Sequence, residues 1–217
     1  MPFQRIASSV GVSVATAHLW TRDIEITAEQ QRRNLGRDIT ADCETIARRA
    51  RGWATTSRRK REQWQTEGRS RAMDMDPLHM AGCMLYWAEG SKSRNSAQLT
   101  NSDVHLVRFF RRFVSECFSV SGEGFSVRLN VYTGNGLSLY DIESYWLDAL
   151  GLPRVCLRKH SLNHFPTSSS GGKKNKLPYG VCALRVLRST HVVQHIYGAI
   201  QAYAGFEEPR WLDALRS

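Results

Sequence analysis

An acidic residue closes the most apolar stretch of the chain. From Leu78 to Ala88 nearly every residue is apolar or small, and Glu89 and Gly90 follow directly. If this stretch is a helix, the Glu89 carboxylate lies at its C-terminal end, where the helix dipole disfavours an anion unless a cation is near. A carboxylate beside free helix-end carbonyl groups suits Mg²⁺, which prefers oxygen ligands and keeps several waters. Glu89 is therefore the predicted metal ligand.

The helix that would position Glu89 has a clear start signal. Asp76 can cap it, and Pro77 fits the first helical position because its ring fixes φ near helical values. No polar stripe runs along residues 78–88, so we expect this helix to be buried around most of its circumference. Ala81 and Gly82 are small enough to let another backbone approach closely.

This pattern resembles the LAGLIDADG homing endonucleases, whose signature is a buried interface helix that ends in Ala-Asp/Glu-Gly and leads into a strand that meets DNA. Here Ala88-Glu89-Gly90 matches the end of the motif, whereas Met84 stands where the family has a tight-packing glycine. The resemblance implies an antiparallel sheet backed by helices and places Glu89 at the metal-ligand position. It also implies that the 77–89 helix can pair two copies of the chain in a homodimer.

Composition favours a polyanionic partner. The 217 residues carry a net charge of +10, with 41% hydrophobic residues, which is enough for a packed core. The alternative is a basic surface that serves solubility alone. No run of 18 apolar residues and no signal-peptide pattern occurs, so we expect no membrane partner and a cytoplasmic location. The five cysteines are scattered without a CxxC pair, which predicts reduced thiols.

Residues 3–24 have the spacing of a helix-turn-helix, and they resemble the helix-turn-helix domains of small bacterial regulators and recombinases. Gly11 permits the turn and Ser13 caps the second helix. The predicted inner residues are Ile6, Ala7, Val10, Val12, Ala17, Trp20 and Ile24. In this motif the start of the second helix enters the major groove, which nominates Ser13, Val14, Ala15, Thr16 and His18 for DNA contact and Arg22 for the phosphate backbone. The alternative is an ordinary helical hairpin.

A basic helical region follows at residues 27–75. Thr27 and Gln30 form a plausible capping box, and helical spacing continues to Trp53. One interpretation is a helical linker that lies along DNA phosphates, with the predicted contacts Arg48, Arg58, Arg59 and Lys60. The other is a solvated, charged helix.

Alternating strands are expected beyond the central helix. Residues 96–101 direct Ala97 and Leu99 inward, and 125–132 and 179–187 alternate in the same way. A further strand is expected at 155–160. The outward residues are suited to base edges or phosphates, or serve as ordinary solvent cover. The predicted DNA contacts in this region are Arg94, Gln98, Thr100, Arg128, Asn130, Tyr132, Arg158 and Arg185, with Lys173, Lys174 and Lys176 in a loop.

The sequence thus predicts an α+β protein. Its regions are a helix-turn-helix at 1–26, a basic helical linker at 27–75, a LAGLIDADG-like domain at 76–206 and a tail at 207–217. From residue 77 the expected order is helix, strand, helix, strand, helix, strand, strand, helix.

Two functions are compatible with these features. The first is non-catalytic, sequence-specific binding of double-stranded DNA by a regulatory or mobile-element protein. The second is a Mg²⁺-dependent, site-specific endonuclease in which Glu89 binds the metal and Lys92 or Lys159 stabilises the developing negative charge. Because only one acid-ended helix exists in the chain, cutting both strands would require a homodimer.

Overall fold

The computed structural model describes residues 3–132, 136–163 and 177–213, with only the helical backbone for 33–42. The protein is α+β, as predicted, and the order of elements from residue 77 is the expected one. The chain divides into two compact units, Met1–Thr56 (unit 1) and Ser57–Ser217 (unit 2), with the boundary inside one helix. None of the helices described is both long and apolar enough to cross a membrane.

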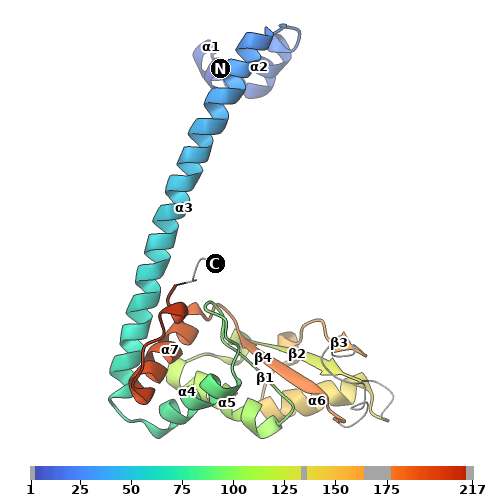
Figure 1. The fold of residues 1–217 in the computed structure, drawn as a ribbon. Helices are drawn as coiled ribbons and strands as arrows, with labels where there is room; N and C mark the ends of the chain where they lie inside the picture. The colour runs from blue at the N-terminus through green and yellow to red at the C-terminus, as the bar shows by residue number, and fades with distance from the viewer. Residues whose placement is uncertain (1–2, 133–135, 164–176, 214–217) are drawn as a thin grey trace. The chain divides into compact units, whose positions relative to one another are not determined.

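The elements follow one another along the chain as drawn in Figure 1. Unit 1 holds α1 (Phe3–Val10), α2 (Val14–Thr21) and the first part of α3 (Ala28–Ala72). Unit 2 holds the rest of α3 and the helices α4 (Pro77–Glu89), α5 (Val104–Phe118), α6 (Leu139–Leu150) and α7 (Thr190–Ala204). It also holds the strands β1 (Gln98–Asn101), β2 (Phe125–Val131), β3 (Ser161–Leu162) and β4 (Val181–Val186), and the 3-10 helices η1 (Gly122–Gly124), η2 (Arg154–Cys156) and η3 (Pro209–Trp211).

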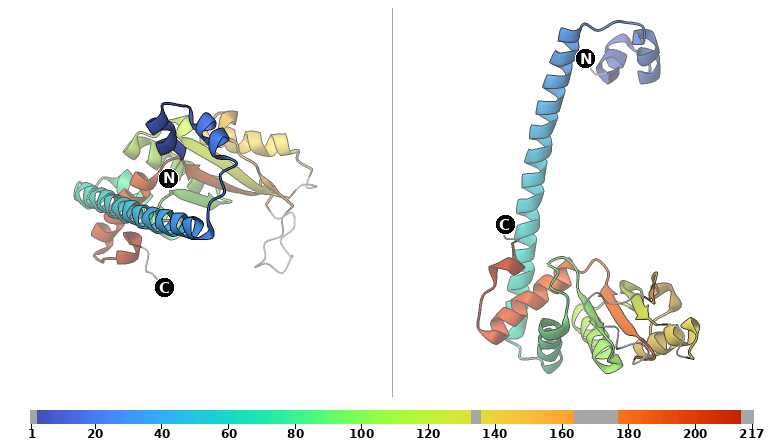
Figure 2. Two further views of the ribbon diagram at one scale, coloured as in Figure 1. Left: turned by 90° about the horizontal axis from the view of Figure 1, so that it is seen from above. Right: turned by 45° about the vertical axis from the view of Figure 1, so that its right-hand side comes forward.

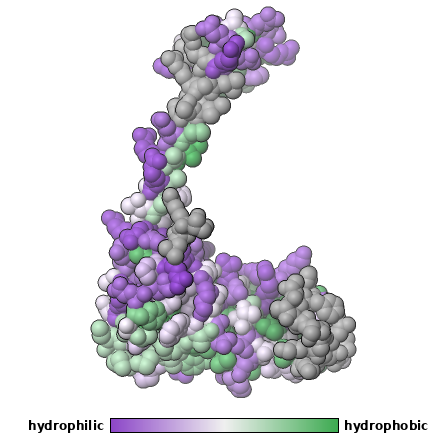
Figure 3. Space-filling model, in the orientation of Figure 1, coloured by the Kyte–Doolittle hydropathy of each residue, from purple (hydrophilic) through white to green (hydrophobic). Residues whose placement is uncertain are grey.

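The helix α3 is continuous over 45 residues. It begins at the predicted capping box, in which the Gln30 amide N–H donates to the Thr27 hydroxyl at 3.3 Å and the Thr27 N–H donates to the Gln30 side chain at 3.1 Å. Its visible surface is mostly hydrophilic, with a short hydrophobic patch (Figure 3). Ile46 is one of the exposed hydrophobic residues of α3.

The sheet of unit 2 has the strand order β1-β4-β2-β3. β4 pairs antiparallel with β1 and with β2, but the short β3 pairs parallel with β2 through Asn130 and Ser161. The expectation of a wholly antiparallel sheet is therefore wrong at one edge. The chain reaches β3 through α6 and η2, a crossover that returns it to the sheet in the direction of β2.

The two faces of the sheet differ in chemistry. The predicted inner residues of β1, β2 and β4 are fully or almost fully buried, and α5 and α6 cover this face (Figure 1). The outward residues include the exposed side chains of Thr100, Arg128, Asn130 and Arg185. Burial on one side and exposure on the other follow from the two-residue period of a strand.

The predicted strand at residues 155–160 is wrong. Arg154–Cys156 is a 3-10 helix, and the strand that follows is β3. The ring of His160 is inside: its Nδ1 accepts from the Leu129 N–H at 3.1 Å, and its Nε2 lies 2.9 Å from the Glu143 carboxylate. The His160 ring thus accepts the hydrogen bond of a β2 amide that a carbonyl of a neighbouring strand would otherwise accept.

The helix α4 begins as predicted, with the Asp76 side chain accepting from the Leu78 and His79 amides. It is not buried around most of its circumference, however, because Ala81, Trp87 and Ala88 are exposed. Its small residues serve the contact with α5: a Cβ at Gly82 would lie 2.2 Å from the Phe113 ring. One side of α4 therefore packs tightly and the other stays open.

The start of α5 is capped by Asp103, whose side chain accepts from the His105 N–H at 2.8 Å. The side chain of Asn101 accepts from the Asp103 N–H at 2.9 Å and so supports the turn in front of the helix.

The last turns of α3 lie against α7, as Figures 1 and 2 show. A Cβ at Gly68 would come within 2.0 Å of the His195 carbonyl oxygen, and one at Gly198 within 2.0 Å of the Gln65 carbonyl oxygen. Next to this crossing, Gln65 donates to Gln194 at 2.8 Å and accepts from Gln201 at 3.2 Å. The two backbones are in contact, and buried amide side chains satisfy one another beside them.

A histidine pair, with His79 buried and His195 half-buried, lies at the same junction. The Nε2 atoms of His79 and His195 are 3.0 Å apart, and His79 Nδ1 lies 2.9 Å from the Tyr203 hydroxyl. Burial, followed by the charges of His79 and Arg71, lowers the pKa of His195 from 6.5 to about 4. The pKa of His79 is lowered for the same leading reason. Both rings are therefore neutral at pH 7.

The glycine crossing predicts a strong contrast between two identical substitutions in α3. Gly68→Ala should lower the free energy of unfolding by roughly 1–3 kcal/mol, because its methyl group has no space against α7. The control is Gly52→Ala, where nothing lies within 4 Å and the better helix former should stabilise by about 1 kcal/mol. Urea unfolding followed by circular dichroism measures both. Equal effects would contradict the close crossing.

The histidine pair predicts a loss of stability in mild acid. Between about pH 6.5 and 4 the unfolded chain binds a proton at His195 that the folded protein does not, so stability is full above pH 6.5 and declines as pH falls. The shift corresponds to about 3 kcal/mol. Urea unfolding at pH 7.5 and at pH 5 should show the decline, and His195→Gln should reduce it, with the contribution of His79 remaining. A variant with the unchanged slope would place the titrating group elsewhere.

Candidate nucleic-acid interface

Unit 1 presents the start of α2 to solvent. Gly11 adopts a φ of +73° between α1 and α2, and the Ser13 side chain caps α2 by accepting from the Thr16 N–H at 3.1 Å. The hydroxyls of Ser13 and Thr16 are also 2.8 Å apart. Ser13 and Thr16, both predicted DNA contacts, therefore also stabilise the start of α2.

The other predicted contacts of α2 are accessible. Val14, Ala15 and His18 are exposed, and the ring of His18 lies 4.9 Å from that of Phe3. Arg22 is exposed and lies 3.6 Å from Asp23. An accessible, capped helix start is the arrangement that a groove-reading helix requires.

The predicted inner residues of unit 1 are only partly inside. Ala7 and Ala17 are buried and Ile6 and Val12 are half-buried. Three others are exposed, contrary to expectation: Val10 at 58%, Trp20 at 62% and Ile24 at 63%. Two eight-residue helices touch along a narrow line, so small residues fill the contact and the larger side chains project past it.

The outer face of the sheet carries cationic and polar neutral side chains in rows across the strands. In one row Gln98 of β1, Arg185 of β4 and Ser126 of β2 are register partners. A second row consists of Thr100, Ala183 and Arg128, and a third of Val181, Asn130 and Ser161. None of these register positions holds an acidic residue. Two guanidinium groups, two amides and several hydroxyl groups thus share one face.

Glu89 lies at the β1 edge of this sheet. Gly90 forms a bridge with Leu99, and the Ser91 N–H donates to the Gln98 carbonyl at 2.8 Å, which holds the end of α4 against β1. The exposed Glu89 carboxylate accepts from the Asn101 side-chain amide at 3.2 Å. This contact was not predicted from the sequence. The alternation of residues 96–101 is the signal that could have suggested it, since it makes Asn101 the last residue of the strand beside the helix end.

The lysines assigned with Glu89 occupy different places. The Lys92 ammonium group donates to the Trp87 carbonyl, so it compensates the C-terminal end of α4 close to Glu89. Lys159 precedes β3 at the opposite edge of the sheet, and strands lie about 4.8 Å apart, which separates the two edges by about 14 Å. Within one chain, Lys159 therefore does not join Glu89 in a site.

Several other predicted DNA contacts already have partners. Arg94 donates to the Leu212 carbonyl at 3.3 Å. Arg158 is exposed and donates to the carbonyls of Val155 and Leu157. Tyr132 is half-buried directly after β2. The side chains of Arg94 and Arg158 therefore already donate hydrogen bonds within unit 2, and that of Tyr132 is only partly accessible.

The basic residues of α3 are of two kinds. Arg48, Arg59 and Lys60 are exposed. Arg58 pairs with Asp213 at 3.0 Å and with Glu62 at 3.2 Å, and its pKa is raised chiefly by its hydrogen bond to Asp213. The charge of Arg58 is thus compensated locally. Lys173, Lys174 and Lys176 lie outside the described residues.

In the part of the chain that the structure describes, no group of three or more histidine, cysteine, aspartate or glutamate side chains is arranged to hold a metal ion. Comparisons with protein-family models, with curated proteins and with solved structures found no match. The LAGLIDADG and helix-turn-helix resemblances stay predictions.

Proposed function

We propose that this protein binds double-stranded DNA sequence-specifically, without cutting it, and that it uses both α2 and the outer face of the sheet. The observation that carries the proposal is the composition of that face. Its register rows hold Arg128, Arg185, Asn130 and Gln98 and no carboxylate. A face that served only as solvent cover would be expected to mix both signs of charge.

These side-chain types match the groups that a duplex exposes. An arginine can donate two hydrogen bonds to guanine, and an asparagine or glutamine can pair with adenine in the major groove. Arg128 and Arg185 are on neighbouring antiparallel strands and one register row apart, so their charges cover adjacent positions. The net charge of +10 adds attraction to the phosphates that does not depend on sequence.

The helix α2 supplies a second, independent contact. Its exposed residues Val14, Ala15 and His18 can reach base edges, and Arg22 a phosphate. Arg48, Arg59 and Lys60 of α3 are exposed and supply further positive charge for phosphates. Taken with the resemblances, a regulatory or mobile-element role in the cytoplasm of a bacterium, or in a phage, is part of this proposal.

The sheet face predicts a specific loss of affinity. After selection of a binding site from randomised duplexes, Arg128→Gln and Arg185→Gln should each weaken binding roughly 10-fold or more. If both contact phosphates, the double variant should also reduce the slope of log affinity against log salt by about 2. Fluorescence anisotropy measures both quantities.

The matched control is Arg210→Gln, which removes the same charge from a residue that pairs with Glu208 at 2.6 Å. It should leave the affinity within about 2-fold of wild type, since its charge is already compensated. Equal losses in the control and the sheet variants would mean that only net charge matters, and the sheet would not be the interface.

A Mg²⁺-dependent endonuclease is the alternative, and one observation favours it. Glu89 is exposed at the sheet edge with Asn101 holding its carboxylate. Mg²⁺ is commonly bound by one or two carboxylates with waters and substrate phosphates, so Glu89 fits as one ligand. When bound, Mg²⁺ supplies a Lewis acid that activates water near neutral pH. A homodimer paired through α4 would bring two such carboxylates together.

Plasmid cleavage separates the two functions. If the protein is an endonuclease, wild type with Mg²⁺ should cut a plasmid that carries the selected site, and Glu89→Gln should abolish cutting while binding stays intact. The non-catalytic proposal predicts no Mg²⁺-dependent cutting by wild type, with binding that weakens steeply as salt rises. Cleavage that Glu89→Gln abolishes would overturn it.

A further inference from the structure

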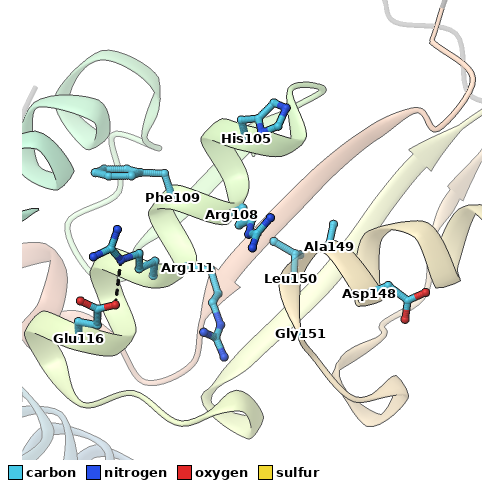
Figure 4. A pocket seen from close by; sticks show the side chains of 10 residues that line it. His105, Arg108, Phe109, Arg111, Glu116, Asp148, Ala149, Leu150 and Gly151 are labelled. Atoms are coloured by element: carbon cyan, nitrogen blue, oxygen red, sulfur yellow. Dashed lines mark hydrogen bonds and ion pairs between the residues drawn. The ribbon is translucent and has the colours of Figure 1, made fainter.

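A groove runs between α5 and the end of α6, on the side of unit 2 away from the outer face of the sheet. Its lining side chains come from α5 on one side and from residues 148–151 on the other (Figure 4). Its volume is about 670 Å³. Ligand sites commonly have volumes of about 300–1,000 Å³, so the groove has room for a molecule of nucleotide size.

Three arginines of α5 line this groove, and they differ in their partners. Arg112 pairs with Glu116 at 2.9 Å, so its charge is compensated. For Arg108 and Arg111, no ion pair is present among the residues that the structure describes. The Nε of Arg111 is buried and has no hydrogen-bond partner there. The Nε itself is shielded from solvent, but two guanidinium groups without a carboxylate partner line the groove, and such donors suit an acceptor supplied from outside the chain.

The remaining charged groups do not cancel this excess. Asp148 is exposed on the α6 side of the groove and is not paired with either arginine. His105 lies one turn before Arg108 on the same side of α5 and also lines the groove. The groove therefore presents two available guanidinium groups to a space that is open to solvent.

We infer that this groove binds a phosphate group, which Arg108 and Arg111 hold by charge-assisted hydrogen bonds. The planar guanidinium fork matches the spacing of phosphate oxygens, and two such forks can satisfy one group that carries several acceptors. The phosphate can belong to a free phosphorylated small molecule or to the backbone of a nucleic acid. α5 and the sheet separate the groove from the face proposed to meet DNA, so one duplex against that face does not fill it.

Nuclear magnetic resonance of the arginine Nε–H groups tests the inference on the full chain. Titration with inorganic phosphate should move the Arg111 signal in a saturable way, whereas sodium chloride at equal ionic strength should not. Arg108→Gln should weaken this response roughly 10-fold, since it removes one charged donor pair. Arg210→Gln, which makes the same change of charge outside the groove, should leave it unchanged.

A second arm identifies the source of the phosphate. A short duplex without terminal phosphates that moves the Arg111 signal would assign the groove to a nucleic-acid backbone. A response to inorganic phosphate alone would assign it to a free phosphorylated ligand. An Arg111 signal that follows neither probe, or that follows sodium chloride equally, overturns the inference whatever the sheet and α2 do. The wild-type titration needs no substitution, so a variant that failed to fold would not affect the result.

Discussion

The contact between α3 and α7 determines how the rest of unit 2 can be built. Two helices whose backbones touch at Gly68 and Gly198 cannot slide or rotate without a steric clash, so the position of α7 is set by the end of α3. Buried Gln65, Gln194 and Gln201 restrict the crossing further, because each amide needs a particular partner. α4 then packs beside α7, α5 beside α4, and the sheet on α5. The polar face of the sheet is available because α5 and α6 pack on its other side.

Polar groups in the interior and at the surface of this protein differ in their charge and in their hydrogen-bond partners. Where amides and imidazoles enter the interior, as at Gln194 and the His79–His195 pair, they bond to one another and stay uncharged. Guanidinium groups are kept at the surface, where some are neutralised by carboxylates and others are not. Among the residues that the structure describes, most arginines have no carboxylate partner, and they include those to which binding is assigned above. Electrostatic complementarity of this kind affects specificity and association rate more than the stability of the fold.

Much of the fold follows from local sequence signals. The Asp76-Pro77 start of α4 and the Thr27–Gln30 capping box of α3 were readable because cap chemistry involves neighbours within four residues. The inner residues of β2 were readable for a similar reason, since strand alternation has a fixed period. Among the candidate site residues, the outward positions Thr100, Arg128, Asn130 and Arg185 were predicted correctly as exposed.

What failed depended on contacts between distant parts of the chain. The separation of Lys159 from Glu89 follows from strand order, which periodicity does not encode. The inward ring of His160 depends on Glu143, and the arginine groove depends on α5 meeting the end of α6. The exposure of Trp20 and Ile24 shows another limit: an apolar residue at helical spacing is inside only if a surface exists to cover it. Helical spacing identifies a side of a helix but not its partner.

The ring of His160 and the turn after α4 have a shared consequence for assembly. A β-sheet can recruit a foreign strand wherever an outermost strand offers unused backbone groups. On one side the outermost strand, β3, has only two residues, and the imidazole occupies an amide of β2 next to it; on the other side the Ser91 amide occupies a carbonyl of β1. Strand-by-strand polymerisation is thereby discouraged at both ends, which lets a strongly polar sheet remain uncovered without becoming a template for fibres.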